Sequence, residues 1–210
     1  MDSLNKNEKL RLAAKEFAEK AHKLSSTLEI AVVGSVAGND PYPDDIDMAI
    51  IIKDLNDIAL LAKYARQMSS IYHNWDGFLF DKDLNYIGRI CHRRECPGQS
   101  VECKVPGCGE NTHIKVIDDF EFDEVKFFKS PIDVTWKSST ESLLISRKNE
   151  LGIVETQKYE VLKDIELMCK ICGATFVFTG AEQKYYNNRG FSVPRRCENC
   201  REKKMLEYID

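Results

Sequence analysis

The spacing of hydrophobic residues along the first 80 positions alternates between two periods, and each period predicts one kind of element. Apolar residues three or four positions apart, with charged residues between them, predict two amphipathic helices, at residues 6–25 and 55–72. Asp54 is placed to cap the second of these helices. Continuous apolar runs predict three strands, at residues 28–33, 46–53 and 75–80. This order of elements predicts an α/β layered architecture.

The second half of the chain contains fewer long apolar runs. Strand-like runs at residues 114–117 and 131–136 lie on either side of an acidic stretch, and mostly polar sequence follows them. We interpret this polar sequence as a partly helical connector. The chain is therefore expected to consist of a first domain, a connector and a small second domain, at residues 1–136, 137–164 and 165–210.

The composition describes a globular protein without a predicted membrane segment. Of its 210 residues, 43% are apolar and 30% are charged, which suits one ordinary domain with a small module. No window approaches eighteen uninterrupted apolar residues, and the charged N-terminal stretch lacks the apolar core of a signal peptide. We therefore expect a cytoplasmic protein that does not contact membranes. The net charge of −4 does not by itself predict a polyanionic partner.

Eight cysteines fall into two groups of four, and a reducing compartment favours metal ligation over disulfide bonds for both groups. The first group is Cys91, Cys96, Cys103 and Cys108. It lies in an insertion at about residues 88–113, whose Pro-Gly turns could bring four thiolates around zinc. His92 and His113 could replace a thiolate, and buried or free thiols without metal are the alternative. Arg89 belongs to a basic cluster here that could contact phosphate or could simply be solvated.

The second group forms two CxxC pairs, Cys169 with Cys172 and Cys197 with Cys200, separated by 24 residues. Two such pairs complete a tetrahedral zinc site when their turns face each other. The run that contains them resembles a small bacterial zinc-ribbon family with the pattern CxxCG..F.F...EQ.(F/Y)Y...G...P.RC..CR. The resemblance implies a zinc ribbon. Residues 169–204 contain eight Lys or Arg and three Glu, with aromatic residues between them. This basic and aromatic surface could bind unpaired bases, or it could be an ordinary solvated surface.

A turn and a pair of acidic residues in the segment 28–53 form the main candidate site. The first apolar run ends at Gly34-Ser35, which predicts a tight turn, and a loop of Gly, Asn, Asp and Pro follows. Asp45 and Asp47 then open the next strand, where residues two apart point the same way. Two carboxylates on one face repel each other unless a cation lies between them, so this pair predicts a divalent metal site. A surface turn rich in acidic residues is the simpler alternative.

The succession of Gly-Ser, nine residues, Asp-x-Asp and an apolar strand resembles the DNA polymerase β-like nucleotidyltransferase superfamily, especially its minimal members. The resemblance implies an α/β (α+β) nucleotidyltransferase-like fold. It implies that Gly34 and Ser35 open a helix that holds the phosphates of a nucleotide. It also implies that Asp45 and Asp47 bind catalytic magnesium.

The resemblance further implies a third carboxylate on a neighbouring strand. Asp76 is favoured for this role by its order along the chain, and Asp133 has the same local pattern of flanking apolar residues. Many minimal members carry Ala-Arg-Gly after the Gly-Ser-x, whereas Ser35 is followed here by Val36, Ala37 and Gly38. The missing arginine affects the expected phosphate contacts more than the expected fold.

These features lead to one expected function and one alternative. The resemblance implies a metal-dependent nucleotidyltransferase that moves a nucleoside monophosphate from a nucleoside triphosphate to an unknown acceptor, either nucleic acid (RNA or DNA) or protein. The zinc modules would serve structure and partner recognition. The alternative is a non-catalytic nucleic-acid-binding or regulatory zinc protein on a nucleotidyltransferase scaffold, because a fold does not guarantee an activity.

Overall fold

The protein is described by a computed structural model that covers residues 5–71, 75–91, 113–115, 121–155 and 158–206. The chain divides into two compact units, Met1–Tyr159 and Glu160–Asp210. The first unit has a mixed α/β fold, and the second is a small cysteine-rich module. Among the described residues, no helix is both long and apolar enough to cross a membrane.

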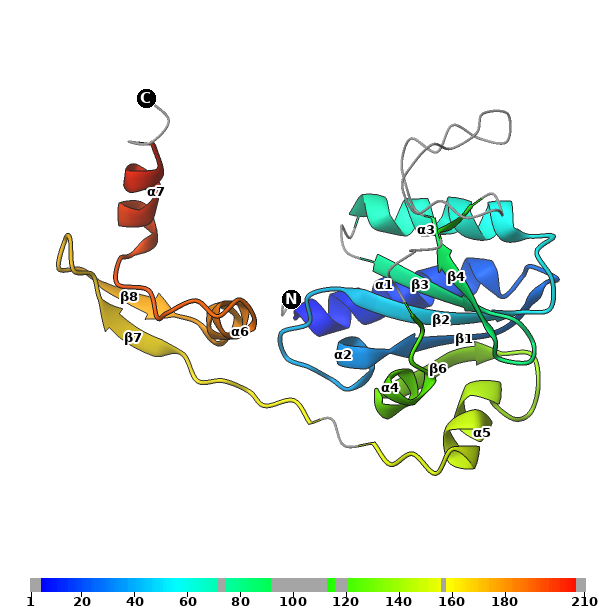
Figure 1. Ribbon diagram of the computed structural model, residues 1–210. Coiled ribbons are helices and arrows are strands. Elements are labelled where there is room, and N and C mark those ends of the chain that lie inside the picture. The colour runs from blue at the N-terminus through cyan, green and yellow to red at the C-terminus, as the bar shows by residue number, and fades with distance from the viewer. Residues whose placement is uncertain (1–4, 72–74, 92–112, 116–120, 156–157, 207–210) are drawn as a thin grey trace. The chain divides into compact units, whose positions relative to one another are not determined.

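A six-stranded sheet with the order β5-β4-β3-β2-β1-β6 forms the centre of the first unit (Figure 1). The strands are β1 (Thr27–Val33), β2 (Ile46–Ile52), β3 (Trp75–Phe80), β4 (Tyr86–Ile90), β5 (Ile114–Lys115) and β6 (Ile132–Lys137). The pair β2 and β3 is parallel, and the other neighbouring pairs are antiparallel. The first residues of β2 and β3 therefore lie side by side at one edge of the sheet.

Helices cover both faces of this sheet (Figure 1). One face carries α1 (Lys6–Ala21) and α3 (Ile58–Ile71), and the other carries α4 (Glu124–Lys129) and α5 (Leu143–Glu150). Phe17 and Leu61 belong to the core on the first face, and Phe128 and Leu144 belong to the core on the second face. All four side chains are almost fully buried, so each helix is held to the sheet by its apolar residues.

The strand β2 is apolar after its first residues because both of its faces are buried. Met48 and Ile50 point into the core beneath α1 and α3, whereas Ala49 and Ile51 point into the core beneath α4 and α5. This division follows from the alternation of side chains along a strand. Asp47 shares the α4/α5 face with Ala49 and Ile51, at the point where the strand begins.

The predicted strands are present, except that residues 116–117 of the run at 114–117 lie outside the described residues, and both predicted helices are present but shorter. The helix α1 ends at Ala21 rather than at residue 25, and α3 begins at Ile58 rather than at residue 55. The predicted cap at Asp54 is wrong, because its carboxylate accepts the amide of Asn56 in a local turn. The amides of Leu60 and Leu61 instead donate to the carbonyl of Asp57, where the helix starts.

The boundary expected at residue 136 falls inside β6, so the first unit is longer than predicted. The segment that we expected to be a connector contains α5, which Ser142 caps by accepting a hydrogen bond from the Ile145 amide at 3.0 Å. Leu144 in this helix is fully buried against the sheet, which ties the segment to the first unit. The strand β4 was also not predicted, because five residues that include a glycine and an arginine carry no clear period.

The second unit contains a hairpin and two helices. Its elements are β7 (Ile165–Met168), β8 (Thr175–Phe178), α6 (Gly180–Asn188) and α7 (Glu198–Leu206), and the two strands are antiparallel. Thr179 and Glu182 form a capping box that starts α6 directly after the hairpin. Phe178 is buried against the ring of Tyr186, at 5.2 Å between ring centroids. Few other side chains of this unit are buried, so its own apolar core is small.

Candidate functional site

The parallel pair of β2 and β3 brings the predicted carboxylates together. Asp47 is the second residue of β2 and stands directly opposite Asp76, the second residue of β3. Partners in register point to the same face, and here it is the face that also carries Ala49 and Phe80. Asp45 precedes β2 by one residue. The charges of Asp45 and Asp76 both act on Asp47, so the three carboxyl groups form one acidic cluster.

The electrostatics of this cluster disfavour three negative charges. Burial, followed by the charges of Asp45 and Asp76, raises the pKa of Asp47 to about 7, and the positive charge of Arg89 opposes this rise only in part. Burial also raises the pKa of Asp45, followed by the charges of Asp76 and Asp44. A divalent cation beside the carboxylates would relieve this repulsion, because oxygen anions are the ligands that magnesium prefers.

Gly34 lies against this cluster. Its backbone has a positive φ of 71°, and its amide donates to the carbonyl of Pro131 at 2.9 Å. A β-carbon at this position would approach Oδ2 of Asp47 to 3.2 Å, so the turn contacts the carboxylate closely. The short helix α2 (Gly34–Ala37) begins here and contains Ser35. The Gly-Ser turn and the acidic pair, which the sequence places apart, therefore lie side by side.

Arg89 on β4 contacts Asp76 from the outer side of the cluster. Its Nη1 donates to Oδ2 of Asp76 at 3.0 Å, and its guanidinium lies over the ring of Phe78, with 4.9 Å to the ring centroid. This arrangement fixes the direction of the Asp76 carboxylate. Among the described residues, the carboxylates of Asp45, Asp47 and Asp76 are not gathered into a compact metal-ligand group, as the four cysteines of the second unit are. The cluster is thus more open than a site closed around one ion.

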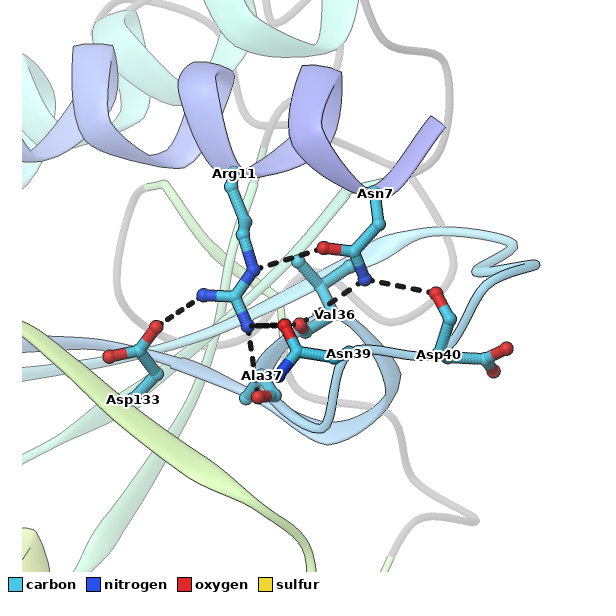
Figure 2. Close-up of polar contacts among 7 residues, drawn as sticks. All are labelled: Asn7, Arg11, Val36, Ala37, Asn39, Asp40 and Asp133. Atoms are coloured by element: carbon cyan, nitrogen blue, oxygen red, sulfur yellow. Dashed lines mark hydrogen bonds and ion pairs between the residues drawn. The ribbon is translucent and has the colours of Figure 1, made fainter. Parts of the chain in front are cut away.

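Asp133, the alternative third carboxylate, lies away from this cluster. It is paired with Val32 across β1 and β6, and Val32 belongs to the core beneath α1 and α3, on the opposite face from Asp47. Its carboxylate forms an ion pair with Nη1 of Arg11 in α1 (Figure 2). The charge of Asp133 does not contribute to the raised pKa of Asp45 or Asp47.

Arg11 and Asn7 of α1 hold the loop that follows α2 (Figure 2). The Nη2 of Arg11 donates to the carbonyls of Val36 and Ala37 at 2.7 and 2.9 Å. The side-chain amide of Asn7 donates to the carbonyl of Asp40 at 3.0 Å and accepts Nε of Arg11 at 2.9 Å. No arginine follows the Gly-Ser turn in the sequence, but α1 supplies Arg11 close to it. Arg11 binds backbone carbonyls of α2. Sequence spacing gave no signal for this contact, since 25 residues separate Arg11 from Val36.

A cavity of about 780 Å³ lies between β3 and α4, on the sheet face that carries Asp47 and Asp76, although none of the three carboxylates lines it. Phe78 follows Asp76 by two residues on the same face and forms one wall of the cavity. The remaining wall comes from α4 and the residues around it: apolar Phe122, Val125 and Phe127, charged Glu121, Asp123, Glu124 and Lys126, and Ser130. The wall thus combines aromatic rings with charged side chains, and a volume of this size is in the range of sites for small organic groups.

The raised pKa of Asp47 predicts a specific dependence of stability on pH. Because the folded protein holds this proton up to about pH 7, whereas an ordinary carboxyl releases it near 3.8, stability should fall as pH rises between these values. Replacing Asp47→Asn should remove this loss. At pH 8 the free energy of unfolding of the magnesium-free protein should rise by on the order of 2–4 kcal/mol, and its melting temperature should rise by several degrees. At pH 4 the difference should nearly vanish. Thermal unfolding at both pH values, with and without magnesium, measures this effect; equal melting temperatures at pH 8 would contradict it.

Four cysteines of the second unit form a compact metal site. Cys169 and Cys172 lie in the turn between β7 and β8, whereas Cys197 and Cys200 lie at the beginning of α7. Their sulfur atoms all lie within 4.8 Å of one another. Among the described residues, no other group of three or more His, Cys, Asp or Glu side chains is gathered so closely. Four thiolates at this spacing fit the tetrahedral coordination of zinc.

The backbone around the first pair is arranged for thiolate ligands. Gly173 adopts a φ of 71° and donates its amide to the carbonyl of Cys169 at 2.9 Å, which closes the turn. Amides of Cys172 and Cys197 point at the sulfur of Cys169 and lower the pKa of this thiol to about 6. A thiol that is easily ionised is a better metal ligand.

The prediction of a zinc ribbon for this unit is corrected to a treble clef. Only the first CxxC pair lies in a turn of a hairpin, whereas the second pair lies at the start of a helix, so a helix replaces the expected second turn. Residues 163–206 match the family model described as a probable treble clef domain. Zinc binding at these four cysteines is supported both by this match and by their geometry. No curated protein and no solved structure matches the chain.

The first predicted zinc site lies mostly outside the described residues. Cys96, Cys103 and Cys108 belong to residues 92–112, and so does His92. Cys91 is half-buried at the end of β4, and its amide donates to the carbonyl of His113 at 2.8 Å. Cys91 and His113, which flank residues 92–112, are thus hydrogen-bonded to each other. Zinc binding by the first group of cysteines stays a prediction.

Proposed function

We propose that the protein is a metal-dependent nucleotidyltransferase, which moves a nucleoside monophosphate from a nucleoside triphosphate to a hydroxyl group of an acceptor. The observation that carries this proposal is the acidic cluster beside the Gly34 turn. Asp47 and Asp76 face each other on parallel strands, Asp45 lies two residues before Asp47, and Gly34 contacts Asp47. Acidic side chains under mutual repulsion beside a glycine turn suit a nucleotide bound with divalent cations.

The residues of the cluster have distinct proposed roles. Asp45 and Asp47 would hold magnesium, which neutralises charge that develops on the phosphates and orients them for in-line attack. Ser35 and the amides that follow Gly34 would bind the terminal phosphates. The acceptor oxygen forms a bond to the α-phosphorus while the bond from that phosphorus to the bridging oxygen breaks, and pyrophosphate leaves. Asp76 would take the proton of the acceptor hydroxyl, and the hydrogen bond from Arg89 would hold its carboxylate in position.

The cavity along β3 is proposed as the place of the acceptor. It is lined by Phe78, two residues beyond Asp76 on β3, and by Ser130, which directly precedes the Pro131 whose carbonyl accepts the Gly34 amide. An acceptor group seated there would present its hydroxyl to Asp76 while the triphosphate occupies the Gly34 side. The acceptor hydroxyl would belong to RNA, DNA or a protein.

The alternative function is a non-catalytic nucleic-acid-binding or regulatory zinc protein. Two observations favour it. Arg89 already neutralises part of the charge of Asp76, as a structural ion pair would. In the second unit, the guanidinium of Arg189 lies 3.9 Å from the ring centroid of Tyr185, and Tyr185 and Phe191 are half exposed. An exposed ring that carries an arginine can stack on an unpaired base while the cation contacts phosphate.

Incubation of the full chain with α-³²P-labelled nucleoside triphosphates and magnesium tests the proposed function. Cellular RNA, DNA and protein fractions serve as acceptors, so that the labelled fraction identifies the acceptor class. We expect label to appear in one of these fractions and pyrophosphate to be released in equal amount. Label from the γ-position should not be transferred, since the γ-phosphate leaves with pyrophosphate. Binding of nucleic acid without any transfer would support the alternative.

A further inference from the structure

The described residues 151–155 and 158–159, which follow α5, contact the first unit, and we call them the strap. Ile153 packs against the core beneath α4 and α5. The buried Lys148 donates to the carbonyl of Ser130 at 3.0 Å and lies 3.5 Å from the carboxylate of Glu155, which holds the strap near β6. The strap ends at Tyr159, the last residue of the first unit.

The ring of Tyr159 lies on Gly38, the residue directly after α2. A β-carbon at Gly38 would come within 2.4 Å of Cε2 of Tyr159 and within 2.8 Å of Pro131. No side chain larger than a hydrogen atom fits between the loop and this ring. The turn that starts at Gly34 is thus covered at its far end by a residue from a distant part of the sequence.

The hydroxyl group of Tyr159 is buried, and it has no hydrogen-bond partner among the described residues. A buried hydroxyl without a partner is unfavourable because it has lost its hydrogen bonds to water, so such groups usually meet a ligand or a water molecule. Burial, followed by the charges of Asp40, Asp47 and Glu155, raises the pKa of Tyr159 to about 12. The hydroxyl therefore keeps its proton at physiological pH and is available as a donor.

We propose that Tyr159 is a further ligand-binding residue of the site, whose hydroxyl donates a hydrogen bond to a phosphate oxygen of the nucleoside triphosphate held at the Gly34 turn. This inference rests on the proposed nucleotidyltransferase function. A phosphate fits better than an acceptor group, because the ring lies on the loop after Gly34 and not on the cavity at Phe78. A neutral donor among anionic side chains also suits an anion that arrives with its own magnesium.

The test compares Tyr159→Phe with the unchanged full chain by titration calorimetry, with magnesium and triphosphates that carry a non-hydrolysable α,β-linkage. Because phenylalanine keeps the ring on Gly38 and removes only the donor, we expect the dissociation constant of the triphosphate to rise about tenfold. The melting temperature of the ligand-free protein should stay the same or rise, since a buried hydroxyl without a partner is removed. Tyr64→Phe, on the opposite face of the sheet, is the matched control and should bind as the unchanged chain does.

The outcomes separate this inference from the proposed function. If the unchanged chain binds the triphosphate, Asp45→Asn with Asp47→Asn abolishes binding and Tyr159→Phe leaves it unaltered, then only the role of Tyr159 is refuted. A lowered melting temperature for Tyr159→Phe without weaker binding would assign the hydroxyl a structural hydrogen bond and would likewise refute the role. If the unchanged chain binds none of the four triphosphates, both the role and the proposed function are refuted.

Discussion

Replacing Asp45 and Asp47 together by asparagine is expected to lower nucleotidyl transfer by at least about 10³-fold. The substitution keeps the size of both side chains but removes the charges that would hold magnesium, and metal neutralisation supplies several kcal/mol of transition-state stabilisation. The fold should persist, because burial and mutual repulsion already disfavour these charges in the absence of metal. The measurement is the rate of label transfer from the α-labelled triphosphate.

Asp44→Asn is the matched control for this experiment. Asp44 is exposed and adjacent to Asp45, so its replacement changes the local charge by one unit and weakens the repulsion on Asp45, but it removes none of the three carboxylates of the cluster. Transfer by this variant should stay within about twofold of the unchanged chain, as expected for an exposed charge. Undiminished transfer by the double variant would place the chemistry elsewhere. A loss of equal size in the control would indicate a general electrostatic effect rather than metal ligation.

Replacing Cys172→Ser is expected to unfold the second unit while the first unit stays folded. The buried core of the second unit is small, so most of its folding free energy should come from metal binding, on the order of 10 kcal/mol for a structural zinc site. A serine in place of one thiolate leaves three ligands and opens the site. Amide spectra should show loss of dispersion for residues of the second unit alone, and elemental analysis should show the loss of one zinc per chain.

Cys91→Ser is the control for the zinc measurement. Cys91 lies at the end of β4 and belongs to the other group of cysteines, so this variant should retain the zinc of the second unit. If the unchanged chain carries two zinc ions, Cys91→Ser should lose the other one, which would establish a metal site in the insertion. A second unit that remains folded in Cys172→Ser would contradict the expectation that zinc stabilises it.

The local parts of the candidate site could be predicted from the sequence because one strand contains most of them. An apolar run with Asp47 near its start fixes both the strand and the face to which the carboxylate points. To predict that Asp47 pairs with Asp76, one more assumption is needed, namely that β3 lies beside β2 and parallel to it. The helix α3 between the two strands favours this arrangement, because parallel neighbouring strands are usually connected by a helix. The face of Asp133 could not be predicted, because it depends on a register shift between β1 and β6.

Contacts between distant segments left no signal in the sequence. Arg11 binds the carbonyls of Val36 and Ala37, and such backbone acceptors do not depend on residue type. Tyr159 reaches Gly38 from a segment that seemed to be only a connector. The helix that carries Cys197 and Cys200 was likewise missed, since CxxC spacing suits both a turn and the first turn of a helix.

The position of Tyr159 affects how the two units can be separated. It is followed directly by Glu160, the first residue of the zinc-bearing unit. A shortened protein that stops at the end of α5 would lose this aromatic cover of the Gly34 turn together with the zinc unit. A drop in nucleotide affinity in such a protein would then be attributed to the loss of the zinc unit, although the loss of the Tyr159 side chain would cause it. Truncation after residue 159 keeps the two contributions distinct.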